Sequence, residues 1–226
     1  MSVFNRLFGR SKRATGIRDT LFGDMSLDQW AAGTSPEDFP WSAIAASRSH
    51  LAASNIEGAI QCWREVLAAQ DLESRHYLQA WHFLRQYGQH PTADFAKLVL
   101  GVVVEVGMPK GLDLLAAYPT HSARYYSCGG AGVVWEHSDN SIDSLIASLL
   151  SASAQVVAQI GPWDKDRPPA PPPGQVRLSF LTPSGLHFGQ GPISAIASDP
   201  VGGRVFQLAT GLMQALITKT SEKALG

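Results

Sequence analysis

The chain has 226 residues, of which 45% are hydrophobic, and its 18 basic and 19 acidic residues give a formal net charge of −1. That hydrophobic content excludes a wholly disordered chain, which needs low hydrophobicity and high net charge. The charge balance argues against nucleic acid as a partner, because general binding to phosphates depends on a basic surface. Two cysteines, Cys62 and Cys128, are too few for a disulfide scaffold or a four-thiolate zinc site.

The sequence predicts a cytoplasmic protein. It contains no run of about 18 apolar residues, so we expect no transmembrane helix. Residues 1–9 do not make a secretory signal, because Arg6 interrupts the apolar stretch that such a signal needs. Without a signal, both thiols are expected to stay reduced.

Residues 1–19 form a basic arm. Its apolar residues recur at helical spacing, at Phe4, Leu7 and Phe8. Arg6 and Arg10 are among the basic residues between and after them. Two interpretations remain open. One is a solvated tail, which Gly9 and Gly16 favour because glycine weakens a short helix. The other is an amphipathic helix through which residues 1–18 contact a partner or an anionic membrane at its inner face.

Residues 20–91 are predicted to be a helical region. Ser26 can cap a first short helix, and apolar residues keep helical spacing in three further segments, 41–54, 55–70 and 71–88. Gly88 and Pro91 end the last of these helices.

Residues 43–93 resemble tetratricopeptide repeats. The residues at the packing and turn positions of one repeat are Ala43, Ala46, Ser47, His50, Ser54, Ala59, Trp63 and Val66. Adding the period of about 34 residues to Ala43, Ser54 and Ala59 gives residues that suit the same positions, namely Tyr77, Gly88 and Ala93. Lys97 departs from the pattern at the next large position. The resemblance implies one repeat and the first helix of another, which would pack on the rest of the chain and offer a surface for docking a protein.

Residues 92–226 are predicted to combine strands with helices. Four strands within 98–136, separated by short turns, favour an antiparallel meander. A helix capped by Ser141 follows over 141–160, with Val156 expected in its apolar stripe. Three more strands within 176–198 and a helix over 201–220 repeat the order. We therefore predict an α+β fold: the helical region packed on an antiparallel sheet with two helices, in which a strands-then-helix unit occurs twice. Whether residues 92–100 end the helical region or begin the sheet stays open.

Residues 161–174 form a Pro-rich loop with six prolines. The favoured interpretation is a stiff surface spacer, and the alternative is a ligand for a proline-binding module.

The candidate binding residues fall in two groups. Tyr and Trp are favoured at interfaces, so an aromatic run that we expect to be exposed is the candidate docking surface: Tyr125, Tyr126, Trp135 and His137. Because neighbouring strand residues point to opposite faces, Tyr125 and Tyr126 cannot both face the core. An anion could bind at the start of the last helix, at Gly202, Gly203 and Arg204, although Asp199 is expected to cap that helix itself.

The hypothesis that the sequence favours is a cytoplasmic adaptor or accessory subunit that binds another protein and has no catalytic activity. No metal or cofactor is expected, because the seven histidines lack zinc-site spacing and no phosphate loop opens a helix. One alternative is a peripheral membrane protein held by the arm. The other is an enzyme of unassigned chemistry, with a pocket between the helical region and the sheet that holds several of five residues: His121, Arg124, Glu136, His137 and His187.

Overall fold

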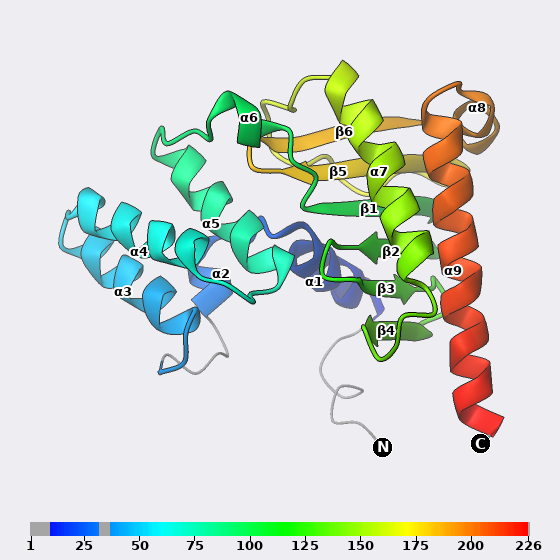
Figure 1. Cartoon of the computed structure of the whole chain (residues 1–226), viewed down its shortest axis with the longest axis horizontal. Helices are drawn as coiled ribbons and strands as arrows, with labels where there is room; N and C mark the ends of the chain where they lie inside the picture. Colours follow the sequence, from blue (N-terminus) through cyan, green and yellow to red (C-terminus); the bar gives the residue numbers. More distant parts are fainter. Residues whose placement is uncertain (1–9, 32–36, 226) are drawn as a thin grey trace. The chain divides into compact units, whose positions relative to one another are not determined.

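The computed structural model describes residues 10–31 and 37–225, which form two compact units, residues 1–92 and residues 93–226. In the described residues the first unit contains helices only, and the second contains a six-stranded antiparallel sheet with helices (Figure 1). The predicted α+β class is therefore confirmed. None of the helices among the described residues is long and apolar enough to cross a membrane.

The first unit contains five helices within its described residues: α1 (Arg10–Phe22), α2 (Leu27–Ala31), α3 (Trp41–Ala52), α4 (Ile56–Ala68) and α5 (Ser74–Gln86). Helix α4 begins where it does because the Asn55 side chain accepts a hydrogen bond from the Gly58 amide, which caps the first turn. Trp63 and Phe83 are buried in the core that α3, α4 and α5 share.

The predicted end of the arm at residue 19 falls inside a helix. Helix α1 continues to Phe22, and Leu21 and Phe22 are buried in the structure, so they anchor the end of this helix. Gly16 lies inside α1 and does not end it. The physical reason is that two buried apolar side chains outweigh the weak helix propensity of a single glycine.

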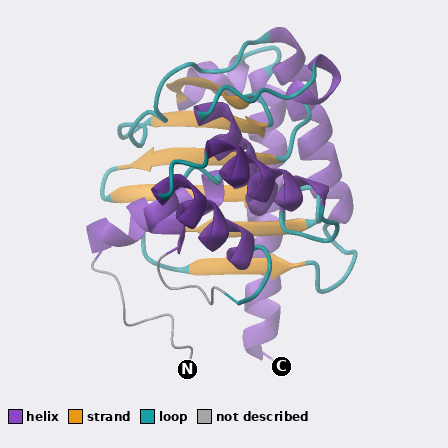
Figure 2. Cartoon of the chain, turned by 90° about the vertical axis from the view of Figure 1, so that its left-hand side faces the viewer, coloured by secondary structure: helices purple, strands orange, loops and turns teal. Residues whose placement is uncertain are grey.

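The second unit begins with a short helix, α6 (Ala93–Ala96), and the sheet begins only at Gly101. Residues 92–100, left open by the sequence, therefore contain a helix and no strand. Four strands then form the predicted meander: β1 (Gly101–Met108), β2 (Gly111–Ala117), β3 (Ser122–Tyr126) and β4 (Gly132–Glu136). After helix α7 (Asp143–Gln159), strand β5 (Gln175–Thr182) pairs with the far side of β1, and β6 (Gly185–Pro192) pairs with β5. The strand order is β4-β3-β2-β1-β5-β6 (Figure 2).

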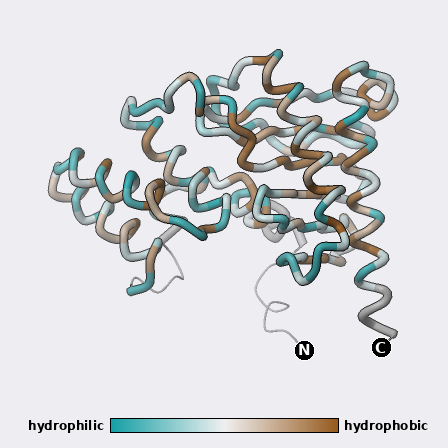
Figure 3. Tube along the Cα trace, viewed as in Figure 1, coloured by the Kyte–Doolittle hydropathy of each residue, from teal (hydrophilic) through white to brown (hydrophobic). Residues whose placement is uncertain are grey.

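Helices α7 and α9 (Gly202–Leu225) lie side by side on one face of this sheet (Figure 1). Their apolar residues meet the alternating residues of the strands in one core, which includes Val104, Leu178, Leu149 and Leu212. In Figure 3 hydrophobic segments run through the sheet and through both helices. The apolar residues that recur at every second position in the strands, and at helical spacing in α7 and α9, thus face one shared core.

Three details of the second unit differ from prediction. Residues 193–198 form helix α8 (Ile193–Ser198) rather than a strand, because Ile193 and Ile196, three residues apart, pack on the core. Ser141 does not cap α7; Ile142 occupies the cap position, and the Ser141 amide donates to Asp139. In α7 the fully buried valine is Val157, not Val156.

Candidate functional site

The sheet has two edge strands, and the β6 edge is obstructed near its start by another part of the chain. The Trp163 amide donates to the Leu186 carbonyl of β6 over 2.6 Å, and the indole of Trp163 packs on Phe188 with ring centroids 5.2 Å apart. The Pro-rich loop 161–174 supplies this cover. The loop therefore occupies one outward carbonyl of β6 and places the Trp163 ring on Phe188, which obstructs the addition of another strand at that end of the edge.

Arg177 of β5 holds the Pro-rich loop in place. Its guanidinium donates to the carbonyls of Pro168 and Pro169 over 3.1 and 2.8 Å, and to a Glu105 carboxylate oxygen over 3.2 Å. Glu105 and Arg177 are 0% and 2% exposed. Arg177 faces Glu105 because β5, not β3, lies next to β1 at this point.

The β4 edge is open. Among residues 10–31 and 37–225, β3 is the only strand that pairs with β4. The Ser127 amide donates to the Ala131 carbonyl at the start of the β3–β4 hairpin, so the ladder alternates from that pair. Val133 and Trp135 then bond to β3, while Gly132, Val134 and Glu136 turn their backbone N–H and C=O groups outward. All three outward residues are exposed.

The three outward residues of β4 carry different side-chain chemistry. Val134 is 52% exposed, which is high for a large aliphatic residue in a strand. Tyr126 lies over Gly132, since a Cβ atom added to Gly132 would come within 2.9 Å of Cδ1 of the Tyr126 ring. Glu136 accepts a hydrogen bond from Nη2 of Arg124 over 2.9 Å, yet 57% of its side chain remains exposed.

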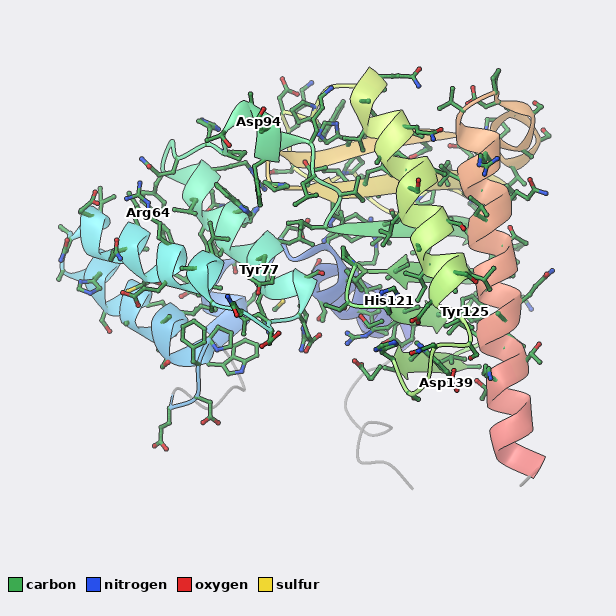
Figure 4. The ribbon with its side chains drawn as sticks, in the orientation of Figure 1. Arg64, Tyr77, Asp94, His121, Tyr125 and Asp139 are labelled. Carbon is green, nitrogen blue, oxygen red and sulfur yellow. The ribbon has the colours of Figure 1, made fainter. Side chains whose placement is uncertain are left out.

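A histidine cluster lies beyond the end of β4. The rings of His121 and His137 stack with centroids 5.2 Å apart, and Asp143 at the start of α7 lies between them. His137 Nε2 is 3.1 Å from Asp143 Oδ2, and His121 Nδ1 is 3.6 Å from Asp143 Oδ1. Both histidines have a left-handed backbone, with φ of 59° and 56°. Figure 4 shows His121 and Asp139 at this end of the sheet.

The predicted aromatic run is divided between the core and the edge. Tyr125 and Trp135 are 8% and 7% exposed in the sheet core, so the expectation that they are exposed is wrong. Their side chains point to the face of the sheet that α9 covers, opposite to the side chains of Gly132, Val134 and Glu136. Figure 4 shows Tyr125 on this side. Tyr126 and His137 lie at or beyond the open edge, so half of the run is accessible there.

Tyr125 and Cys128 share one carboxylate. The Tyr125 hydroxyl donates to Asp113 Oδ2 over 3.1 Å, and the Cys128 amide donates to Asp113 Oδ1 over 2.7 Å. Burial and the neighbouring carboxylate raise the pKa of Tyr125 to about 12. Desolvation and Asp113 also raise the pKa of the Cys128 thiol, which disfavours the thiolate that a nucleophile needs. A cavity of about 30 Å³ beside Tyr125 has room for about one water.

The predicted anion site is filled by the protein itself. At the start of α9 the Asp199 side chain accepts hydrogen bonds from the Val201 and Gly202 amides over 3.0 and 2.6 Å. Gly203 is buried and bonds back to the Asp199 carbonyl, while Arg204 is exposed. Asp199 therefore takes the place that an anion would occupy, as its position before the helix predicted.

The remaining predicted residues divide as follows. Phe4, Leu7, Phe8 and Arg6 lie outside the described residues, and Arg10 begins α1, with its side chain outside the description. Of the five residues of the enzyme hypothesis, His187 lies apart, beside Ser184 near the β5–β6 turn. The other four lie on or next to β3 and β4. No group of three or more His, Cys, Asp or Glu in the described part of the chain could hold a metal ion.

Comparison with family models, with curated proteins and with solved structures finds no match to this chain. The site is therefore interpreted from its own geometry. Sequence reasoning missed Gly132 and Val134. The signal that could have found them is the short strand 132–136, which has no Lys, Pro or other protective residue at its centre.

Proposed function

We propose that this protein is an interaction module, an adaptor or accessory subunit, that docks another protein along the β4 edge. The observation that carries this proposal is the difference between the two edges: Trp163 of the Pro-rich loop obstructs β6 at Leu186 and Phe188, whereas β4 turns unpaired backbone groups and a 52% exposed Val134 to solvent. Exposed edges without protective residues are sites of strand addition in binding proteins. The reducing compartment expected from the sequence fits the two cysteines, which are free thiols.

The test is affinity purification from the native cell, with mass spectrometry of what comes along. Val134→Pro removes one outward amide and no β3 bond, whereas Val134→Thr keeps the amide and a β-branched shape. We expect a stoichiometric partner with the wild type and with Val134→Thr, and its loss with Val134→Pro. A solitary protein in every sample, or a partner retained equally by Val134→Pro, would overturn the proposal.

A deletion in the same experiment separates the edge from the arm. Deletion of residues 1–9 leaves α1 whole, whereas deletion of residues 1–18 would cut it. A partner retained without residues 1–9 places docking on the rest of the chain. Release of the protein from anionic liposomes by the same deletion would support the membrane hypothesis instead.

One observation favours a second candidate function, proton-transfer catalysis. His137 Nε2 lies 3.1 Å and His121 Nδ1 3.6 Å from the two oxygens of Asp143, and a histidine beside a carboxylate is a common arrangement for general acid–base catalysis. This candidate predicts a small-molecule ligand whose stabilising effect in a thermal-shift screen is lost in His137→Gln. A screen in which no ligand depends on His137 would remove it.

A further inference from the structure

The proposed docking edge has a defined chemical order. Along β4 the outward residues present a glycine under an aromatic ring, an aliphatic side chain and a carboxylate, at Gly132, Val134 and Glu136. These residues share one face, because strand residues two apart point the same way. Every second residue of an added strand would therefore lie beside one of these three residues, each with a different side-chain chemistry.

We propose that the β4 edge binds an extended segment of a partner protein, antiparallel to β4, with the pattern basic–x–aliphatic–x–apolar. The aliphatic residue lies beside Val134, the Lys or Arg two positions earlier lies beside Glu136, and the apolar residue two positions later lies beside Gly132 and the Tyr126 ring. This inference rests on the proposed function and adds the chemistry of the partner.

The unpaired backbone favours an extended occupant. The outward N–H and C=O groups of Gly132, Val134 and Glu136 gain partners only from another strand, whereas a helix keeps its backbone bonds to itself. In an antiparallel pairing each of these residues would exchange both of its backbone hydrogen bonds with the residue opposite. This arrangement is more stable per residue than parallel pairing.

The charge at the end of β4 sets the basic position. Glu136 is bonded to Arg124 on one side, but the exposed fraction of its side chain is 57% against 12% for Arg124. A carboxylate accepts several hydrogen bonds, so a second cation can approach Glu136 from the open side. Asp139, three residues further on, is 53% exposed but has the Lys219 ammonium 4.0 Å from its Oδ2, so Glu136 is the carboxylate that sets the basic position.

A second copy of this chain fits the edge less well. Strand β4 has five residues, so its ladder spans about 17 Å at 3.4 Å per residue. Pairing over that length buries well under the 1,200–2,000 Å² or so of a stable interface. A twofold pairing about Val134 would also place Gly132 opposite Glu136 and bring no cation to the carboxylate.

The test is an NMR titration of the ¹⁵N-labelled full chain with the peptide Ac-Ser-Lys-Thr-Val-Thr-Ile-Ser-NH2. We expect saturable shifts of the Gly132, Val134 and Glu136 amides, with the outward Phe188 and Gln190 amides of the β6 edge as an internal control. N-methylation of the peptide valine should abolish binding, because its amide faces β4. N-methylation of the preceding threonine, whose amide faces away, should leave binding intact.

The predicted ion pair is tested by reversing the charge first on the peptide and then on Glu136. Replacing the peptide lysine by glutamate should weaken binding about threefold to fivefold, as expected for one exposed ion pair. Glu136→Lys should reverse that preference, so that the glutamate peptide binds better than the lysine peptide. Equal affinities for the two peptides would overturn the basic position while leaving strand docking in place.

The remaining outcomes separate this inference from the proposed function. If no peptide shifts the β4 amides at millimolar concentration, but Val134→Pro still loses the native partner, the partner chemistry is wrong and the docking function stands. If peptides fail and Val134→Pro keeps the partner, both are wrong. Concentration-dependent shifts of the β4 amides without peptide, with a dimer by light scattering, would assign the edge to a second copy and overturn this inference.

Discussion

The two edges of one sheet are treated in opposite ways. Strand β6 is held under the Pro-rich loop by a backbone bond from Trp163 and by the guanidinium of Arg177. Strand β4 has five residues, no loop over it among the described residues, and an exposed Val134 at its centre. The difference teaches that one edge is obstructed by the chain's own loop while the other keeps its outward backbone groups accessible, and it is the accessible edge that can bind a further strand.

The largest expected effect comes from breaking the cover of the β6 edge. Arg177→Ala leaves Glu105 buried without its cation and should lower the free energy of unfolding of the second unit by about 3–5 kcal/mol. Hydrogen exchange of the β5 and β6 amides under native conditions checks this. The double variant Glu105→Gln with Arg177→Met is the control, since it removes both charges and should recover part of the loss.

The alternation of backbone bonds in β4 is tested by moving one proline. Val133→Pro removes an amide bonded to β3 and should cost about 1–3 kcal/mol, because the facing carbonyl of Tyr125 loses its donor. Val134→Pro removes an outward amide and should cost clearly less. Denaturant unfolding of both variants measures the difference. Equal losses would mean that the outward residues have been assigned wrongly.

Removing the aromatic contact should convert the covered edge toward the open one. Trp163→Ala deletes the packing on Phe188 and should cost about 0.5–1.5 kcal/mol. Faster exchange of the β6 amides, with the β4 amides unchanged, is the expected signature. Trp163→Phe keeps a ring and should behave nearly as the wild type; faster exchange in that variant as well would assign the cover to the loop backbone alone.

The smallest effect concerns pH at the β6 hairpin. Burial and the nearby Lys97 lower the pKa of His187 below its ordinary value of about 6.5. The unfolded chain therefore takes up a proton before the folded chain does, so stability is full above that pH and falls as pH drops through it. The free energy of unfolding should depend less on pH below about 6.5 in His187→Gln. An unchanged slope would contradict this role.

The sequence predicted the element types where periodicity was strong. The period of two in 101–136 and 175–182 defined five strands, and helical spacing defined α3, α4, α5, α7 and α9. It failed at α8, where Ala and Ser fit a strand or a helix equally well and only the packing of Ile193 and Ile196 decides. The resemblance to tetratricopeptide repeats remains a prediction.

The site was harder to predict because an edge is a property of the whole sheet. Strand β4 is an edge only because β5 pairs with β1 instead of with β4, and nothing local to residues 132–136 records that choice. The aromatic residues were found in the correct strands, yet which face each one occupies depends on the register with β3. Tyr125 and Trp135 therefore went to the core, and Tyr126 to the edge.

The position of β1 also bears on how the chain is made. During synthesis β1 leaves the ribosome well before β5, so until Thr182 emerges this Val-rich strand is itself the boundary of a partial sheet. Glu105 then supplies a charge in the middle of an otherwise aggregation-prone segment. When Arg177 arrives, the same carboxylate becomes half of a buried ion pair, so the residue that protects the nascent strand also marks the completion of the sheet.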